Sequence, residues 1–200
     1  MRTGVRHGAA AQIDLELTFE TWMPPSGAVE RQTSVDSMKY VTVTSAGHFE
    51  QAGRYHGSIR VGGRQAAFEG VGVRDKTWGP VDQTMQHSSA WFAVGFAPNL
   101  AIGARAMSLG VKGMHSGWVL KDGQVRALKS CRVESEYEGR SVKSSVIRLV
   151  DATDDPYEIT AEPLYALPMR EGRARITQTM TRFRYGEHET LGLAEYVENG

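Results

Sequence analysis

The chain has 200 residues, 40% of them hydrophobic, and its 23 basic and 23 acidic side chains give a formal charge of zero. This length supports a proper core, and the neutral balance argues against electrostatic binding to nucleic acid, so we expect no nucleic-acid partner. The single cysteine, Cys131, excludes an internal disulfide framework and a cysteine-rich metal site. No apolar run approaches the roughly 20 residues of a membrane helix, and the first 12 residues lack the apolar core of a secretory signal. We therefore expect a cytoplasmic protein with no transmembrane segment.

Alternating hydrophobicity marks the first predicted strand. In residues 11–20 the odd positions, such as Leu15 and Leu17, are apolar, and the even positions are polar. This period of two is typical of a strand with one buried face, and it recurs around Ile59. The 22 glycines lie at turn-like spacing, which indicates many short elements rather than a few long helices. The predicted strands are 11–21, 38–46, 48–61, 64–73, 88–97, 100–109, 113–120, 124–136, 142–151, 157–165, 173–184 and 190–197.

The turns between these strands favour an antiparallel β-barrel. Lys121-Asp122-Gly123-Gln124 is the strongest hairpin signal, because Asp-Gly accepts positive φ at little cost. The alanine-rich segment 99–108 could form either a strand or a helix. Regular short strands indicate a barrel or a sandwich, and we favour a single up-and-down barrel over residues 11–200, after a flexible segment at 1–10. A barrel of about eight to ten strands removes exposed edges and encloses a cavity.

The segment 70–80 contains the first candidate catalytic residue, Asp75. In an extended chain Val73, Asp75 and Thr77 face one way, and Arg74 and Trp78 face the other. A carboxyl group on the valine side is partly desolvated, which raises its pKa and suits a general acid. Alternatively, Asp75 is structural and pairs with an arginine or with backbone N–H groups at the end of the strand.

His48 and Glu50 form a second candidate pair in His48-Phe49-Glu50-Gln51. In a strand they share a face at about 6.6 Å, near enough for a water-bridged acid/base pair. The alternative is two exposed polar residues on a solvated face.

Other chemical signals are weak. The six histidines show no local metal-ligand spacing, so we expect no metal. Gly70-x-Gly72 lacks the third glycine and the helix of a dinucleotide fingerprint, and Cys131 suits a core position. Trp91, Phe92 and Trp118 either belong to the core or line a pocket for a large apolar ligand.

Three motifs together resemble a known family. Arg74-Asp75-x-x-Trp78-Gly79-Pro80, His48-x-Glu50-Gln51 and the final Gly192-x-x-Glu195-Tyr196 are similar to segments of a largely uncharacterised bacterial lipocalin-like family. That family carries R-D-H-S-W-G-P, H-x-E-Q and G-x-x-E-Y. It is remotely related to carotenoid 1,2-hydratase (hydroxyneurosporene synthase) and to lipocalin-like Diels–Alderases. This chain departs from the pattern at Lys76 and Thr77, where the family has histidine and serine.

The resemblance implies a calycin-type, lipocalin-like β-barrel with an apolar cavity. It also implies hydration, isomerisation or cyclisation of a hydrophobic substrate, a terpenoid among the candidates, by a lyase or isomerase without an organic cofactor. Because family members are often longer, the resemblance leaves open whether this chain is one barrel of a two-barrel protein or a single-barrel version. The candidate protein partners are a second barrel domain and a second copy of the chain in a homodimer.

Two function hypotheses follow. In the first, Asp75, with Glu50 or Glu195 as second candidate, protonates a double bond, and His48 and Arg74 position the acid and the substrate. Aromatic rings then stabilise the carbocation. The substrate-binding candidates are Arg74, Trp78, Trp91, Phe92, Trp118 and Tyr196. In the second hypothesis the protein is a non-catalytic carrier of a hydrophobic metabolite, and Arg74 and Asp75 form a structural ion pair.

Overall fold

A computed structural model describes residues 13–27, 47–79, 87–109 and 112–199 of the chain. These residues form β-strands joined by turns, and none of them is helical, so none forms a helix that could span a membrane. The strands are β1 (Ile13–Thr21), β2 (Ser26–Gly27), β3 (Gly47–Val61), β4 (Arg64–Trp78), β5 (Ser88–Ala97), β6 (Leu100–Leu109), β7 (Lys112–Lys121), β8 (Gln124–Glu138), β9 (Ser141–Asp151), β10 (Pro156–Glu171), β11 (Ala174–Tyr185) and β12 (His188–Asn199).

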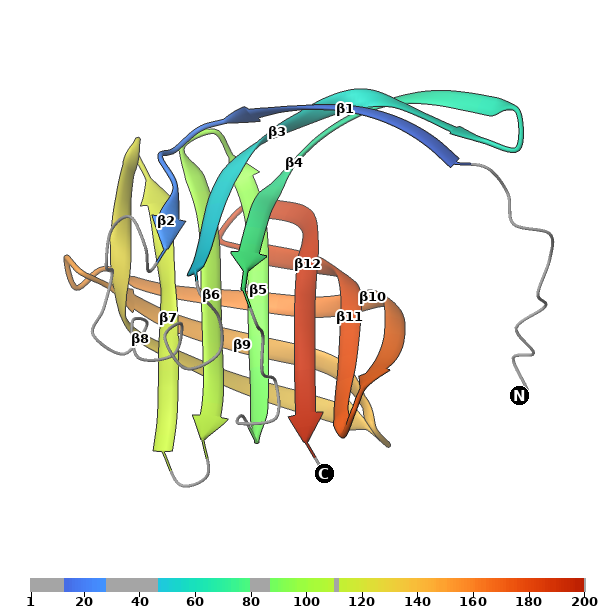
Figure 1. Ribbon diagram of the computed structural model, residues 1–200. Coiled ribbons are helices and arrows are strands. Elements are labelled where there is room, and N and C mark those ends of the chain that lie inside the picture. The colour runs from blue at the N-terminus through green and yellow to red at the C-terminus, as the bar shows by residue number, and fades with distance from the viewer. Residues whose placement is uncertain (1–12, 28–46, 80–86, 110–111, 200) are drawn as a thin grey trace.

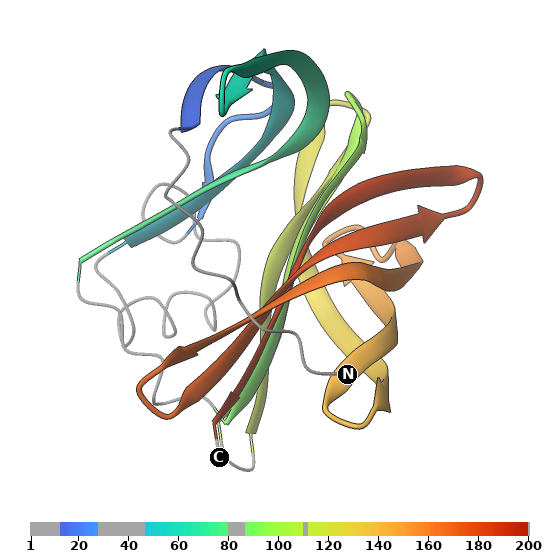
Figure 2. The same cartoon turned by 90° about the vertical axis from the view of Figure 1, so that its right-hand side faces the viewer.

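Strands β5 to β12 close into an eight-stranded antiparallel barrel (Figures 1 and 2). Each strand pairs with the next along the chain, and β12 pairs with β5 to complete the ring. The all-β antiparallel barrel expected from the sequence is thereby confirmed. The barrel occupies residues 88–199, whereas β1 to β4 form a separate sheet outside it, because β3 pairs only with β1, β2 and β4.

Short turns set the register of the barrel strands. Asp122 and Gly123 both have positive φ, at 52° and 75°, which confirms the hairpin predicted from Asp-Gly. Segment 99–108, which the sequence left open between strand and helix, lies almost wholly in β6. The predicted strand at 38–46 lies outside the described residues.

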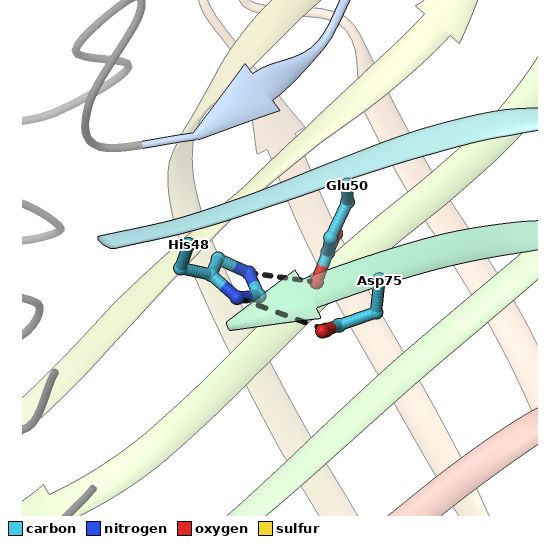
Figure 3. A group of neighbouring side chains, drawn as sticks. All are labelled: His48, Glu50 and Asp75. Atoms are coloured by element: carbon cyan, nitrogen blue, oxygen red, sulfur yellow. Dashed lines mark ion pairs between the residues drawn. The ribbon is translucent and has the colours of Figure 1, made fainter. Parts of the chain in front are cut away.

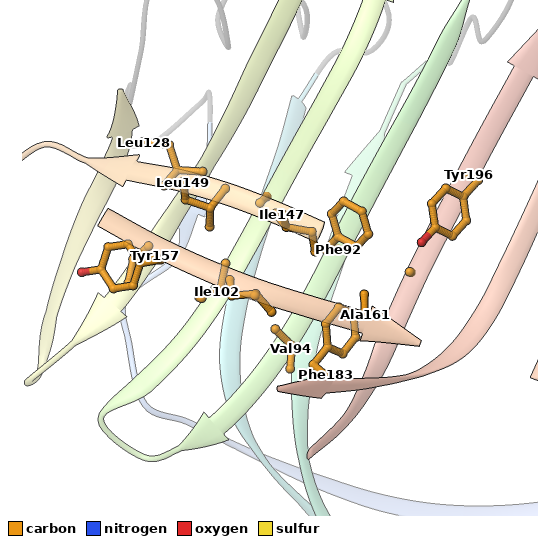
Figure 4. Close-up of a cluster of buried hydrophobic side chains, with 14 residues drawn as sticks. Phe92, Val94, Ile102, Leu128, Ile147, Leu149, Tyr157, Ala161, Phe183 and Tyr196 are labelled. Atoms are coloured by element: carbon orange, nitrogen blue, oxygen red, sulfur yellow. The ribbon is translucent and has the colours of Figure 1, made fainter. Parts of the chain in front are cut away.

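A cluster of buried hydrophobic side chains fills part of the barrel interior (Figure 4). Phe92 is 1% exposed and packs edge-on against Phe183 and Tyr196, with ring centroids 6.3 and 5.9 Å away. Alternate residues of every strand point inward, so one face of each strand supplies the core. The cluster consists of Phe92, Val94, Ile102, Ala104, Val119, Leu128, Ile147, Leu149, Tyr157, Ile159, Ala161, Phe183, Ala194 and Tyr196.

The outer face of β6 and β7 is buried as well, because the second sheet packs on it. Met23 and Ala52 of the N-terminal segment contact Ala101, Trp118 and Leu120 of the barrel, and all five are buried. In Figure 1 this sheet arches over one end of the barrel. The molecule therefore has two apolar interfaces, one inside the barrel and one between the barrel wall and the sheet that covers it.

Candidate active site

A β-hairpin brings His48, Glu50 and Asp75 together (Figure 3). The two-residue turn Gly62-Gly63, with φ of 55° and 82°, joins β3 to β4. Because that turn fixes the register, Glu50 lies directly opposite Asp75. His48 likewise lies opposite Thr77, so the three side chains project from the same end of the hairpin.

Glu50 is anchored to the outer wall of the barrel. Its side chain is 7% exposed, and its two oxygens accept hydrogen bonds from the indole N–H groups of Trp91 and Trp118, each at 2.7 Å. Gly103 makes room for this arrangement, because a Cβ there would overlap both Glu50 Oε2 and the Trp118 ring. Three barrel strands thus form a seat for one carboxylate.

The seat keeps Glu50 ionised. Burial works against the charge, but the hydrogen bond and charge of His48, the charge of Arg105 and the Trp91 N–H outweigh it, so the pKa of Glu50 is lowered. Arg105 lies on β6 with its guanidinium 6.0 Å from the centroid of the Trp91 ring. Glu50 is therefore a fixed negative charge.

The pKa of Asp75 is shifted in the opposite direction. Burial raises its pKa, and the charges of Glu50 and Glu195 raise it further, while those of His48 and Arg105 oppose the shift. Its side chain is 31% exposed, so it remains accessible from outside. Two neighbouring carboxyl groups whose environments shift their pKa values in opposite directions can divide acid and base roles between them.

His48 lies between the two acids. Its Nε2 is 3.3 Å from Glu50 Oε1, and its Nδ1 is 3.8 Å from Asp75 Oδ2. The hydroxyl of Thr77, 3.0 Å from Nδ1, holds the ring from the other side. The sequence predicted a pair bridged by water, whereas His48 and Glu50 are in direct contact.

An apolar pocket opens beside Asp75. Its volume is about 480 Å³, and it is lined by residues of β1, β3 and β4. The sequence predicted that Val73 and Asp75 face the same side of their strand, and this is confirmed. Val73 packs in the interface between sheet and barrel, and Asp75 contacts His48 on the same side. The lining residues are Leu17, Phe19, Tyr55, Val73, Arg74 and Asp75.

Arg74 and Trp78 both pack on Phe49. The Arg74 guanidinium lies 5.3 Å from the centroid of the Phe49 ring, and the Trp78 ring lies 6.2 Å from it in an edge-on arrangement. The described residues show no ion pair between Arg74 and Asp75. Arg74 still lines the apolar pocket.

The remaining sequence candidates divide between the two interfaces. Trp91 and Trp118 reach the site through their N–H groups, whereas Phe92 and Tyr196 point into the barrel. Sequence reasoning did not find Arg105 or Gly103, since strand alternation does not tell which barrel residues meet a second sheet. It could have found the pairing of Glu50 with Asp75, because Gly62-Gly63 is a two-residue hairpin turn and both residues are equally far from it.

The same three residues are where a cation would bind. One atom from each of His48, Glu50 and Asp75 lies within 4.8 Å of the other two, and imidazole and carboxylate groups are common metal ligands. Both Glu50 oxygens already accept an indole N–H, so their remaining lone pairs would have to serve a metal. The absence of a metal stays a prediction.

Residues 1–200 match the family model described as "Domain of unknown function (DUF7064)", so the chain belongs to that family. Its fold is similar to that of the crystal structure of kievitone hydratase from Nectria haematococca, with a TM-score of 0.59 and 12% sequence identity. The similarity covers 93% of this chain and 61% of that one, so the chain spans less than two thirds of its structural relative. None of the curated proteins matches the chain.

Proposed function

We propose that this DUF7064 protein is a lyase or isomerase that protonates a carbon–carbon double bond of a hydrophobic substrate, with Asp75 as the general acid. The observation that carries the proposal is geometric: the partly exposed Asp75 and the buried Glu50, which two indole N–H groups hold in place, both lie beside His48. This arrangement lowers the pKa of Glu50 and raises that of Asp75. The structural relative is, by its name, a hydratase, which is one member of this reaction class.

The surroundings of Asp75 suit an apolar substrate. Leu17, Phe19, Tyr55 and Val73 line, together with Asp75, a pocket whose volume of about 480 Å³ lies within the range of small-molecule sites. The rings of Phe19 and Tyr55, whose centroids are 4.6 Å apart, belong to two of the lining residues. Such rings stabilise a developing cation through their negative faces. Trp118, only 2% exposed, instead serves as an anchor for Glu50.

The reaction needs only the proton of Asp75 and a water molecule. The Asp75 O–H bond breaks as a new C–H bond forms at one alkene carbon, which leaves a carbocation at the other. Water attacks that cation and gives its proton to the Asp75 carboxylate, so the acid is regenerated and the net change is addition of one water. If an internal alkene attacks the cation, or a neighbouring C–H loses its proton to Asp75, the outcome is cyclisation or isomerisation.

Glu50 and His48 prepare this chemistry without leaving their places. The fixed charge of Glu50 makes ionisation of Asp75 costly, which favours its protonated form, and also attracts a cation formed nearby. His48 is held by Glu50 and Thr77 and keeps the two carboxyl groups apart. In this account Glu50 and His48 are positioning residues.

The test is deuterium incorporation. Purified protein in D₂O is incubated with a panel of isoprenoid alkenes, polyenes and prenylated phenols, and products are analysed by mass spectrometry for C–D bonds and for added D₂O. We expect the wild type to label at least one class and Asp75→Asn to label it about 100-fold more slowly, because an amide cannot act as the acid.

Glu69→Gln is the matched control. Glu69 lies on the same strand as Asp75 and forms an exposed ion pair with Arg54, at 2.8 Å. It should label substrate at the wild-type rate. Equal labelling by wild type and folded Asp75→Asn would overturn the proposal, as would wild-type protein that labels no member of the panel.

A further inference from the structure

The two ends of the barrel interior differ in the size of their side chains. Towards the 97–100 turn, the interior is closed by Phe183, Tyr157 and the aliphatic residues around them. Towards the C-terminal end of β12, small residues such as Ala90, Ser108 and Thr177 take the inward positions. Residues this short leave space that large ones would fill.

That space consists of two cavities, of about 440 and 260 Å³. Tyr196 and Glu198 of β12 line both of them, so the cavities are neighbours on either side of one strand. The larger cavity alone lies within the range of small-molecule sites. Its wall also includes Val142 and Pro168, which make one side of it apolar.

Buried hydroxyl groups form the inner end of this space. The Tyr196 hydroxyl lies 3.1 Å from Ser145 Oγ, which lies 2.8 Å from Ser135 Oγ. Thr179, which is 2% exposed and lines the larger cavity, bonds to the carbonyl oxygen of Ala194. Each hydroxyl oxygen has two lone pairs, so these groups can accept a further hydrogen bond.

The mouth of the larger cavity carries two arginines. Arg175 lies 3.6 Å from Glu198, which partly neutralises its charge. Arg140, in the turn before β9, also lines the mouth, and no ion pair of Arg140 occurs among the described residues. The mouth therefore has an excess of positive charge, which suits a carboxylate.

We propose that the barrel interior is a second ligand site, separate from Asp75, that binds a carboxylic acid with an apolar body. The carboxylate lies between Arg140 and Arg175, and the body packs against Val142, Pro168 and the Tyr196 ring. The site is on the inner side of β12, whereas Glu195, next to Tyr196, faces outward toward Asp75. The inference does not depend on the proposed reaction.

Isothermal titration calorimetry with decanoate, and with 1-decanol as the uncharged probe, tests the site. We expect decanoate to bind the wild type. It should bind the double variant Arg140→Gln/Arg175→Gln about tenfold more weakly, whereas 1-decanol should bind both proteins with equal affinity. Ala166→Phe should abolish decanoate binding, because Ala166 lines the cavity.

Two control variants locate the ligand. Leu167→Phe changes the next residue of β10, which is 52% exposed and outside the cavity, and should leave binding unchanged. Asp75→Asn should also leave it unchanged. Circular dichroism melting curves show whether each variant is folded.

Several results would overturn the inference. One is wild-type protein that does not bind decanoate, and another is equal decanoate binding by wild type and a folded Ala166→Phe. Loss of decanoate binding in Asp75→Asn would place the ligand in the pocket beside Asp75 instead. If the arginine double variant loses affinity for 1-decanol as much as for decanoate, the arginines do not bind the carboxylate.

Discussion

The protein has two clusters built around a buried carboxylate, and they are organised in opposite ways. Asp151 is fully buried, and its oxygens accept bonds from the backbone and side chain of Thr153, the amide of Asp155 and the Tyr157 hydroxyl. Arg126 adds an ion pair at 3.2 Å. In the second cluster, the buried Glu50 faces Asp75, a second acid that is partly accessible and raised in pKa.

This difference distinguishes an acid with a structural role, Asp151, from a candidate catalytic acid, Asp75. Burial opposes the ionisation of Asp151, but the surrounding donors prevail and its pKa is strongly lowered, so that it has no proton to give at neutral pH. Asp75 has fewer donors, two acidic neighbours and a pocket beside it. A carboxyl group with satisfied oxygens holds a turn together, whereas one opposed by its neighbours is available for catalysis.

The largest effect should come from the structural cluster. We expect Asp151→Ala to lower the free energy of unfolding by about 3–5 kcal/mol, because it removes several hydrogen bonds at once and leaves buried donors unsatisfied. Urea denaturation measures this. Glu134→Ala, which removes an exposed ion pair with Arg148, should cost about 1 kcal/mol or less. Equal losses would contradict the structural role of Asp151.

Gly103→Ala should disturb the second cluster through sterics alone. Its Cβ would overlap Glu50 Oε2 and the Trp118 ring, so we expect the free energy of unfolding to fall by about 1–3 kcal/mol and the fluorescence of Trp118 to change. Gly113→Ala is the control, because a Cβ there meets nothing within 4 Å. If both variants unfold at the same urea concentration, Glu50 does not occupy the described seat.

Glu50→Gln should cost less stability but alter the acid. One indole N–H loses its acceptor, for which we expect about 1–2 kcal/mol of destabilisation. Removal of the negative charge also takes away one cause of the raised pKa of Asp75, so that pKa should fall toward its ordinary value. Carboxyl ¹³C NMR checks this, and an unchanged pKa of Asp75 would show that the two acids are not coupled.

The smallest effect is on the pH dependence of stability. The folded-state pKa of Asp75 lies above 3.8, so its protonation stabilises the folded protein fully below pH 3.8, and this stabilisation is lost as pH rises through the raised pKa. The Asp75→Asn variant does not lose this free energy. Between acidic and neutral pH its free energy of unfolding should therefore rise relative to that of the wild type, by about 1 kcal/mol or less. Glu50 acts in the opposite sense, since its stabilisation is present above 4.5 and disappears as pH falls through the lowered pKa. Thermal melting from pH 3 to 7 compares the two proteins, and parallel curves would contradict the prediction.

Much of the strand pattern was predictable because it depends on local signals. Alternation marked β1 and most of the barrel strands, and Asp122-Gly123 located the β7–β8 turn. The division into a barrel and a covering sheet was not predictable in this way. A period of two shows that a strand has a buried face, but not which other strand it pairs with or which surface covers it.

The candidate site was predictable in part for the same reason. Alternation placed Asp75 on the side of Val73, and spacing put His48 and Glu50 on one face. The seat of Glu50 was beyond the sequence, because it uses the indole N–H groups of Trp91 and Trp118 on two barrel strands far along the chain. Their aromatic character suggested a ring face for a cation, whereas their function in the structure is to donate hydrogen bonds.

The central claim is that their environments shift the pKa values of Glu50 and Asp75 in opposite directions. Its most direct test is a titration of both side-chain carboxyl carbons by ¹³C NMR in the wild-type protein, with Asp75→Asn and Glu50→Gln to assign the signals. We expect the pKa of Glu50 to lie below its ordinary 4.5 and that of Asp75 to lie above its ordinary 3.8. Ordinary pKa values for both groups, or shifts in the reverse directions, would contradict the claim.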